Sequence, residues 1–172
     1  MSHPPEPSRC AYIALGSNLG DRASTIAAAL RALDRVDGIR LLQTSTLIET
    51  DPVGPVGQGP YLNGVVSVAT SLDPRGLLNV LLAIEQSLGR ERTTEERWGA
   101  RTIDLDLVLF ADTILDEPGL TVPHPRLHER RFVLQPLVEI APDARHPSMN
   151  VTAVELLDRL DTALSDAATP DS

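Results

Sequence analysis

Residues 103–110 read Ile-Asp-Leu-Asp-Leu-Val-Leu-Phe, and this stretch limits the possible folds more than any other. Successive side chains of a β-strand point to opposite faces, so the pattern predicts a strand with Asp104 and Asp106 on one face. A strand this apolar is expected near the centre of a sheet. Two carboxylates there repel each other and require a cation or a basic partner; a solvated strand face is the alternative interpretation.

The order of predicted elements defines the fold class. Apolar patterns, bounded by Gly, Pro or Asp residues that begin or end an element, predict strands at 11–15, 41–50, 61–70 and 103–110. They predict helices at 22–36 and from Pro74 to Gly89. This order indicates an α+β fold with a ferredoxin-like βαββαβ core, in which an antiparallel sheet has both helices on one face. Extra C-terminal helices are expected near 127–140 and 154–164. The loops 51–60 and 89–101 are expected to roof the other, open face.

Length and composition favour a single domain. We expect one domain over residues 10–165, with flexible tails at 1–9 and 166–172 of the 172-residue chain. No apolar run is long enough to span a membrane, and the polar, Pro-rich start lacks the apolar centre of a signal peptide. The only cysteine, Cys10, enters an apolar strand and is interpreted as a packing residue. These features favour a cytoplasmic location.

The charges indicate what class of ligand fits. The net charge of −9 argues against a broad nucleic-acid-binding surface. All 15 basic residues are arginine, and seven of them fall between Arg90 and Arg131, close to the two aspartates. A basic region on an acidic protein suits a small polyanion. The absence of lysine excludes a phosphate-binding P-loop, which needs a Gly-Lys pair.

The aspartate pair and the arginines before it predict metal-assisted phosphoryl chemistry. Two carboxylates on one strand face are a suitable site for a hard divalent cation, and Arg97 and Arg101 lie where they can hold phosphate oxygens. A solvated mixed-charge loop explains Arg90 equally well. Trp98 fits a lid that stacks on a ligand and a simple packing anchor equally well.

Three further features allow more than one interpretation. Tyr61 and Asn63 share a strand face and suit recognition of a flat heterocycle, although ordinary sheet packing explains them as well. His124 sits in a stiff Pro-His-Pro turn, where a structural role is the default and contact with a phosphate or purine the alternative. Residues 16–20 lack the spacing of a dinucleotide-binding turn and are interpreted as a strand-to-helix turn.

Five motifs follow one another in this chain: Tyr-Ile-Ala-Leu-Gly-Ser-Asn-Leu-Gly from 12, Tyr-Leu-Asn from 61, Gly-Arg-Glu-Arg from 89, Arg-Trp-Gly-Ala-Arg-Thr-Ile-Asp-Leu-Asp-Leu from 97 and Val-Pro-His-Pro-Arg-Leu from 122. In this order, over about residues 12–142, they resemble the 6-hydroxymethyl-7,8-dihydropterin pyrophosphokinase family of folate biosynthesis.

The resemblance implies a ferredoxin-like core with mobile catalytic loops and a monomeric enzyme that acts on two small molecules. It implies transfer of pyrophosphate from ATP to the pterin hydroxymethyl oxygen, with release of AMP. Two Mg²⁺ ions would be held by Asp104 and Asp106. A non-catalytic ligand-binding module of the same fold is the alternative from another functional class.

The resemblance also assigns roles to individual residues. The implied catalytic residues are Arg92, Arg101, Asp104 and Asp106. The implied pterin-binding residues are Thr50, Pro52, Val53, Tyr61, Asn63, Trp98 and Phe132, with Tyr61 and Phe132 stacking on the ring. The implied ATP-binding residues are Glu85, Arg92, Arg97, Trp98, Arg101, Leu107, Thr121, His124 and Arg130. The chain departs from the family pattern at Asp51, Gly119, Pro125 and a longer arginine loop at 93–96.

Overall fold

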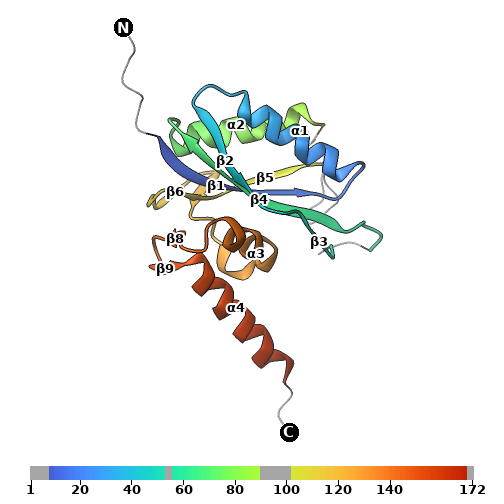
Figure 1. Cartoon of the computed structure of the whole chain (residues 1–172), viewed down its shortest axis with the longest axis vertical. Helices are drawn as coiled ribbons and strands as arrows, with labels where there is room; N and C mark the ends of the chain where they lie inside the picture. Colours follow the sequence, from blue (N-terminus) through green and yellow to red (C-terminus); the bar gives the residue numbers. More distant parts are fainter. Residues whose placement is uncertain (1–7, 53–55, 90–101, 170–172) are drawn as a thin grey trace.

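The computed structural model describes residues 8–52, 56–89 and 102–169 (Figure 1). The elements in these residues are, in chain order, β1 (Arg9–Ser17), α1 (Arg22–Asp34), β2 (Ile39–Thr44), β3 (Ile48–Thr50), β4 (Tyr61–Thr70), α2 (Pro74–Ser87), β5 (Asp104–Phe110), β6 (Leu115–Glu117), β7 (Leu120–Val122), the 3-10 helix η1 (Leu127–Glu129), α3 (Arg131–Ile140), β8 (Arg145–His146), β9 (Val151–Thr152) and α4 (Ala153–Ala168).

The main sheet has the strand order β2-β4-β1-β5, and every pair in it is antiparallel. Helices α1 and α2 pack together on one face (Figure 1). Each is the crossover of one of the two βαβ halves, which is why the chain returns to the sheet in this order. The predicted α+β fold with a ferredoxin-like core is therefore confirmed.

Local capping explains where the two crossover helices begin and end. The side chain of Asp21 accepts a hydrogen bond from the backbone N–H of Ser24, and Asp73 caps α2 through the N–H of Gly76. Such caps satisfy backbone donors that have no partner inside the helix. Gly38 and Gly89 follow the two helices with φ values of +85° and +90°, which favour glycine. The predicted boundaries of these two helices are correct to within two residues.

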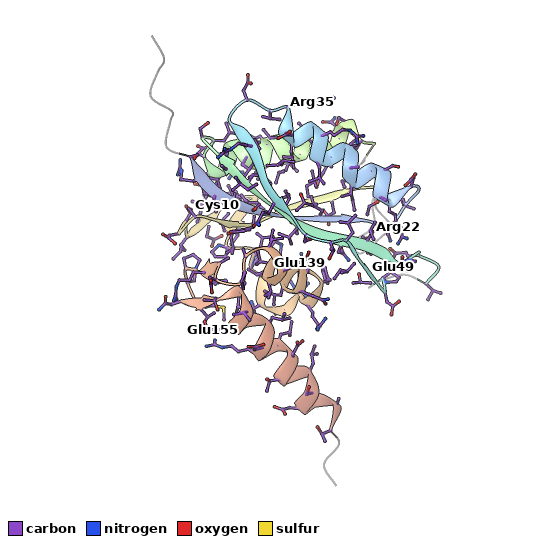
Figure 2. All side chains as sticks on the ribbon, viewed as in Figure 1. Cys10, Arg22, Arg35, Glu49, Glu139 and Glu155 are labelled. Carbon is purple, nitrogen blue, oxygen red and sulfur yellow. The ribbon has the colours of Figure 1, made fainter. Side chains whose placement is uncertain are left out.

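The predicted strand 41–50 is interrupted in the structure. The hydroxyl of Ser45 accepts from the N–H of Val65, while the N–H of Ser45 donates to the Val65 carbonyl. Thr46 then donates from its N–H and hydroxyl to Glu139 of α3, labelled in Figure 2. A Cβ on Gly64 would lie 2.7 Å from Leu47 Cδ2, so a larger residue at position 64 would force the Leu47 side chain to move.

The prediction that residues 103–110 form a central strand is wrong, because β5 lies at the end of the sheet order. Its apolar character has another cause: both of its faces are covered. Leu105, Leu107 and Phe110 enter the core under α1 and α2, whereas Val108 and Leu109 enter a second core. Its outer edge is also bonded, because the Leu105 N–H donates to the buried Glu85 carboxylate at 2.8 Å.

The second face of the sheet is only partly open, which corrects the expectation that loops alone would roof it. Helices α3 and α4 lie on this face, opposite α1 and α2 (Figure 1). Val133, Leu134 and Leu137 of α3 pack with Val65 of β4 and Val108 of β5 in the second core. The stripe of apolar residues in α3 therefore has its own partner surface on the sheet.

Helix α4 begins at a capping box formed by Thr152 and Glu155. It buries Ala153 and Leu156. Leu157 and Leu160 of the expected Val154–Leu164 stripe pack, partly buried, against the second core, whereas Leu164 is 53 % exposed. Residues 166–168, which were expected in the C-terminal tail, continue the helix. In the described ranges no helix has the length and apolar character needed to cross a membrane.

We predict that Leu134→Ala lowers the free energy of unfolding by about 2–5 kcal/mol, because it leaves a cavity in the second core. Leu164→Ala is the matched control and should change it by less than about 0.5 kcal/mol, since that side chain is exposed. Urea unfolding followed by circular dichroism measures both. Equal effects of the two substitutions would show that α3 does not form a core with the sheet.

Candidate active site

The strand register brings three functional positions into one row across the sheet. In β1, Gly16 pairs with Asn63 of β4 on one side and with Asp104 of β5 on the other. Two residues earlier, Ala14 pairs with Val65 and Asp106. Because residues two apart share a face, the carboxylates and the amide flank a floor of small side chains.

This row forms the floor of a cavity of about 610 Å³ on the second face of the sheet. At the α3 end of the cavity, the sheet is covered by the second core. The cavity is lined by Ala14, Leu15, Gly16, Thr50, Asp51, Tyr61, Asn63, Asp104, Asp106, Arg126, Glu129, Arg130, Phe132 and Val133. A cavity of this size suits a small-molecule ligand.

One half of the cavity carries rings and an amide. The buried Asn63 donates from its side-chain N–H to the Thr50 hydroxyl at 2.6 Å, which fixes the orientation of the amide. Tyr61 and Thr50 are cross-strand partners, and Phe132 lines the same cavity from α3 with 37 % of its surface exposed. Two rings and an oriented amide can bind a flat heterocycle by stacking and edge hydrogen bonds.

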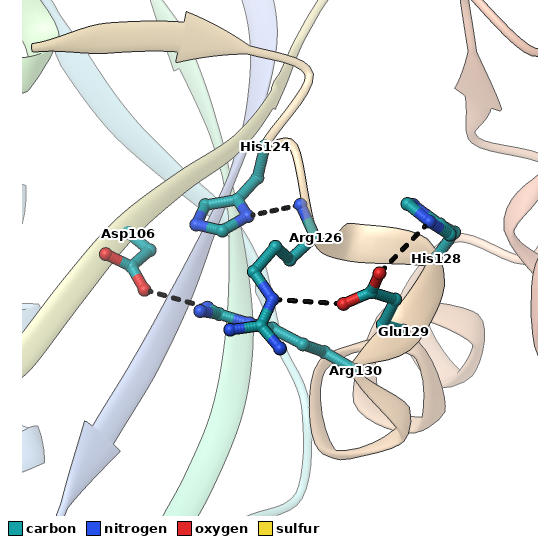
Figure 3. A network of polar contacts seen from close by, with 6 residues as sticks. All are labelled: Asp106, His124, Arg126, His128, Glu129 and Arg130. Atoms are coloured by element: carbon teal, nitrogen blue, oxygen red, sulfur yellow. Dashed lines mark hydrogen bonds and ion pairs between the residues drawn. The ribbon is translucent and has the colours of Figure 1, made fainter. Parts of the chain in front are cut away.

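The other half carries the charges. Asp104 and Asp106 project from β5, and Arg130 Nη1 lies 3.4 Å from Asp106 Oδ2 (Figure 3). Arg126 and Glu129 pair with each other at 3.0 Å on the rim. Within the residues that the structure describes, no three His, Cys, Asp or Glu side chains gather into a metal site. Among the described side chains, the carboxylate pair therefore needs further oxygens, such as those of a ligand or water, to bind a hard cation.

His124 stands beside the charged half. Its backbone N–H donates to the Val108 carbonyl, and its Nδ1 accepts from the Arg126 N–H at 3.1 Å (Figure 3). Burial lowers the pKa of His124 to about 4, and the positive charge of Arg130 adds to this while Asp104 opposes it. The imidazole is therefore neutral at pH 7, with its proton on Nε2.

Other residues assigned by resemblance lie away from the cavity lining or outside the described part. Glu85 and Leu107 are buried on the side of α1 and α2, and Thr121 donates to Asp116 within the β6–β7 hairpin. Pro52 lies two residues after the end of β3. Val53, Arg92, Arg97, Trp98 and Arg101 fall outside the described residues. The assignments of all these residues stay predictions.

The turn after β1 has a function that sequence reasoning missed. Ser17 donates to the Thr102 carbonyl at 2.6 Å, and the buried Asn18 donates to Gln58 at 3.1 Å. Arg22 binds both the Pro60 carbonyl and Glu49, with which it is labelled in Figure 2. These bonds tie Gln58, Pro60 and Thr102, which lies two residues before β5, to the end of β1 and the start of α1.

The cavity also includes Gly16, Asp51, Arg126 and Glu129, to which sequence reasoning gave no binding role. Gly16 lies between Asn63 and Asp104 only through strand pairing, so it could be assigned to the site only once the strand register was known. The rim pair of Arg126 and Glu129 resembles any exposed i, i+3 pair in the sequence.

Comparison with known proteins identifies the family. The family model described as 7,8-dihydro-6-hydroxymethylpterin-pyrophosphokinase (HPPK) matches residues 12–142. The chain belongs to this family. The matched range covers the whole HPPK core, from β1 to the end of α3, and so includes every element that lines the cavity.

Two named relatives are similar over most of their length. A Pseudomonas aeruginosa protein named 2-amino-4-hydroxy-6-hydroxymethyldihydropteridine pyrophosphokinase is 48 % identical over 136 residues, which cover 79 % of this chain and 83 % of that protein. A Bacillus subtilis protein of the same name is 48 % identical over 130 residues, covering 76 % and 77 %.

Solved structures share the HPPK fold at low identity. The crystal structure of wild-type Plasmodium falciparum HPPK-DHPS with pterin and p-hydroxybenzoate superposes with a TM-score of 0.73 at 17 % identity. The match covers 96 % of this chain but 45 % of that one, so the chain spans less than half of this structural neighbour. At this identity the likeness supports the fold alone.

We predict that His124 titrates near pH 4 in the ligand-free protein, as measured by NMR of its imidazole carbons. Between pH 6.5 and 4 the imidazole of residue 124 is protonated in the unfolded chain but stays neutral in the native protein. The free energy of unfolding therefore falls as the pH is lowered through this window. His124→Asn keeps an acceptor at the Nδ1 position but does not titrate. Its unfolding free energy should therefore depend less steeply on pH, and an unchanged slope would contradict the assignment.

Proposed function

We propose that this protein transfers the pyrophosphoryl group of ATP to the hydroxymethyl oxygen of 6-hydroxymethyl-7,8-dihydropterin, a step of folate biosynthesis. The hydroxyl oxygen bonds to the β-phosphorus, and the bond from that phosphorus to the oxygen bridging to the α-phosphorus breaks. AMP leaves with the bridging oxygen, and the hydroxyl proton is lost to a base or water. The other product is the pterin pyrophosphate.

One observation carries the proposal. A heterocycle-binding half, with Asn63, and a carboxylate half, with Asp104, meet on one cavity floor across Gly16. Such a floor can hold an acceptor alcohol beside a phosphate chain, so binding itself brings the reacting atoms together. Phosphoryl transfer depends mostly on this positioning and on stabilising charge.

The donor set fits magnesium. Asp104 and Asp106 offer hard carboxylate oxygens on one strand face, and both line the cavity that the phosphates would enter. We assign them as the protein ligands of two Mg²⁺ ions, which when bound would neutralise phosphate charge and orient the β-phosphorus. Phosphate oxygens and water would complete the coordination, as two carboxylates alone cannot.

The remaining roles follow from family membership and position. Tyr61 and Phe132 would stack on the pterin, while Asn63, Thr50 and the backbone at Pro52 and Val53 would bind its edge. Arg92 and Arg101 would hold the phosphates, and Arg97 and Trp98 would close over both substrates. On the nucleotide side the assigned residues are Glu85, Leu107, Thr121, His124 and Arg130.

We expect the protein to work as a monomer in the cytoplasm, as one domain over residues 10–165, with small-molecule partners only. The net charge of −9 disfavours nucleic acid as a partner. Light scattering coupled to size exclusion would measure the oligomeric state.

Incubation with ATP, Mg²⁺ and the hydroxymethyl pterin should give AMP and pterin pyrophosphate, resolved by phosphorus NMR and ion-exchange chromatography. ADP as the nucleotide product would contradict the proposal. In calorimetry, ATP should bind only with Mg²⁺, because the carboxylate pair otherwise repels the phosphates. A ligand-binding module without catalysis would bind its ligand without regard to metal and release no AMP.

Asp104→Asn and Asp106→Asn should each reduce kcat by at least about 100-fold, because each removes a negative ligand charge at the reacting phosphates. Asp112→Asn is the matched control: Asp112 is exposed in the turn after β5 and should tolerate the change. Steady-state AMP release measures all three. Near-wild-type rates for both cavity variants would remove the metal-ligand assignment.

Gly16→Ala should raise KM for the pterin about tenfold, with a smaller change in KM for ATP. A Cβ there would lie 3.1 Å from Asn63 Oδ1, which would shift the amide away from Thr50. Gly59→Ala is the control, because its Cβ would meet only an ordinary contact at 3.7 Å. An unchanged pterin KM would show that the amide of Asn63 does not bind the substrate.

A further inference from the structure

The guanidinium of Arg130 is placed directly at the proposed metal ligands. Its Nη1 lies 3.4 Å from Asp106 Oδ2, and the two side chains are only 20 % and 33 % exposed (Figure 3). This distance is long for a charge-assisted hydrogen bond, so the pair is held by charge more than by geometry. The Arg130 guanidinium therefore offsets the negative charge of Asp106, which would otherwise attract a metal ion.

The backbone of Arg130 is fixed while its side chain has a second partner. Its N–H donates to the Leu127 carbonyl, and its own carbonyl accepts from Val133 and Leu134 in the first turn of α3. Its guanidinium also lies 5.8 Å from the centre of the Phe132 ring. The charge can thus leave Asp106 by side-chain rotation alone, without moving η1 or α3.

The carboxylate pair by itself is a poor metal site. Mg²⁺ and Mn²⁺ prefer about six oxygen ligands, and across the described ranges no third acidic or histidine side chain joins Asp104 and Asp106. With the Arg130 guanidinium at Asp106, a cation that arrives without nucleotide meets a repelling charge and, among the described side chains, too few ligands.

We infer that Arg130 is the resident counter-ion of Asp106 and makes metal binding depend on the nucleotide. The inference rests on the proposed function, because it takes the aspartates as metal ligands and a triphosphate as the incoming group. Phosphate oxygens provide the missing ligands and also attract the guanidinium, which pairs with phosphate in a bidentate manner. Arg130 would thus leave Asp106 for the phosphates as the nucleotide enters, and Asp106 would then be available to hold a metal ion. In the absence of nucleotide, Arg130 keeps the site closed to metal.

The test compares full-length wild type with Arg130→Met and Arg131→Met. Both variants lose one positive charge, at adjacent positions. The control, Arg131, pairs with Asp161 of α4 at 2.8 Å instead of with the aspartates of β5. The dissociation constant of Mn²⁺ is measured by electron paramagnetic resonance, first for the protein alone and then with α,β-methylene ATP, which cannot release AMP.

Arg130→Met should tighten Mn²⁺ binding to the nucleotide-free protein about tenfold relative to Arg131→Met, and weaken binding of the Mn²⁺–analogue complex about tenfold. Arg130→Lys should stay within about threefold of wild type in the nucleotide-free measurement, because it keeps the charge. The inference would be overturned if Arg130→Met changed the Mn²⁺ dissociation constant in the same direction with and without the analogue. Equal Mn²⁺ affinities of the two Met variants would also overturn it. Failure of the proposed function is distinguishable, since wild type would then release no AMP.

Discussion

The antiparallel register of β1 against β4 and β5 is the constraint on which the rest of the site depends. It sets Asn63, Gly16 and Asp104 in one row, although they are far apart in sequence. A slip of one residue would turn the amide or the carboxylates into the core under α1 and α2. Since that core is apolar, hydrophobic burial on one face fixes the positions of polar groups on the other.

A β-bulge divides the second face of the sheet into its two parts. Tyr12 pairs with Leu109 and Ile13 with Leu107, which leaves Val108 as an extra residue. Before the bulge, β5 presents Asp104 and Asp106 to this face; at the bulge it presents Val108 and Leu109. The strand can therefore line a polar cavity and anchor α3 with one continuous backbone. The Val108 carbonyl also holds His124 at the boundary.

The sequence was sufficient for features set by neighbours along the chain. Asp21, Asp73, Gly38 and Gly89 act through local backbone geometry, so the helix ends were predictable. The failures involve distant pairs of residues. The bend at residues 45–46 is held by hydrogen bonds to Val65 and Glu139, which are distant in sequence. The apolar character of 103–110 indicated burial without showing whether strands or helices cover this segment.

The same distinction applies to the cavity. Periodicity placed Asp104 and Asp106 on one face, as it did Tyr61 and Asn63, because each pair lies on one strand. Strand pairing brings Gly16 between these pairs, and the path of η1 brings Arg126 and Glu129 to the rim. Neither arrangement can be predicted from a local sequence pattern.

The anchoring of the turn after β1 explains where this chain can differ from its relatives. Ser17 fixes Thr102, and Asn18 fixes Gln58, so the segments that carry the sequence departures at Asp51 and 93–96 join the fold at bonded positions. A length change between such anchors alters only the intervening segment, at a loop-closure cost that grows slowly with length. A change in the Asn63–Gly16–Asp104 row would instead require three strands to move together. Variation in this family is therefore expected in the segments between such anchors, with the floor preserved.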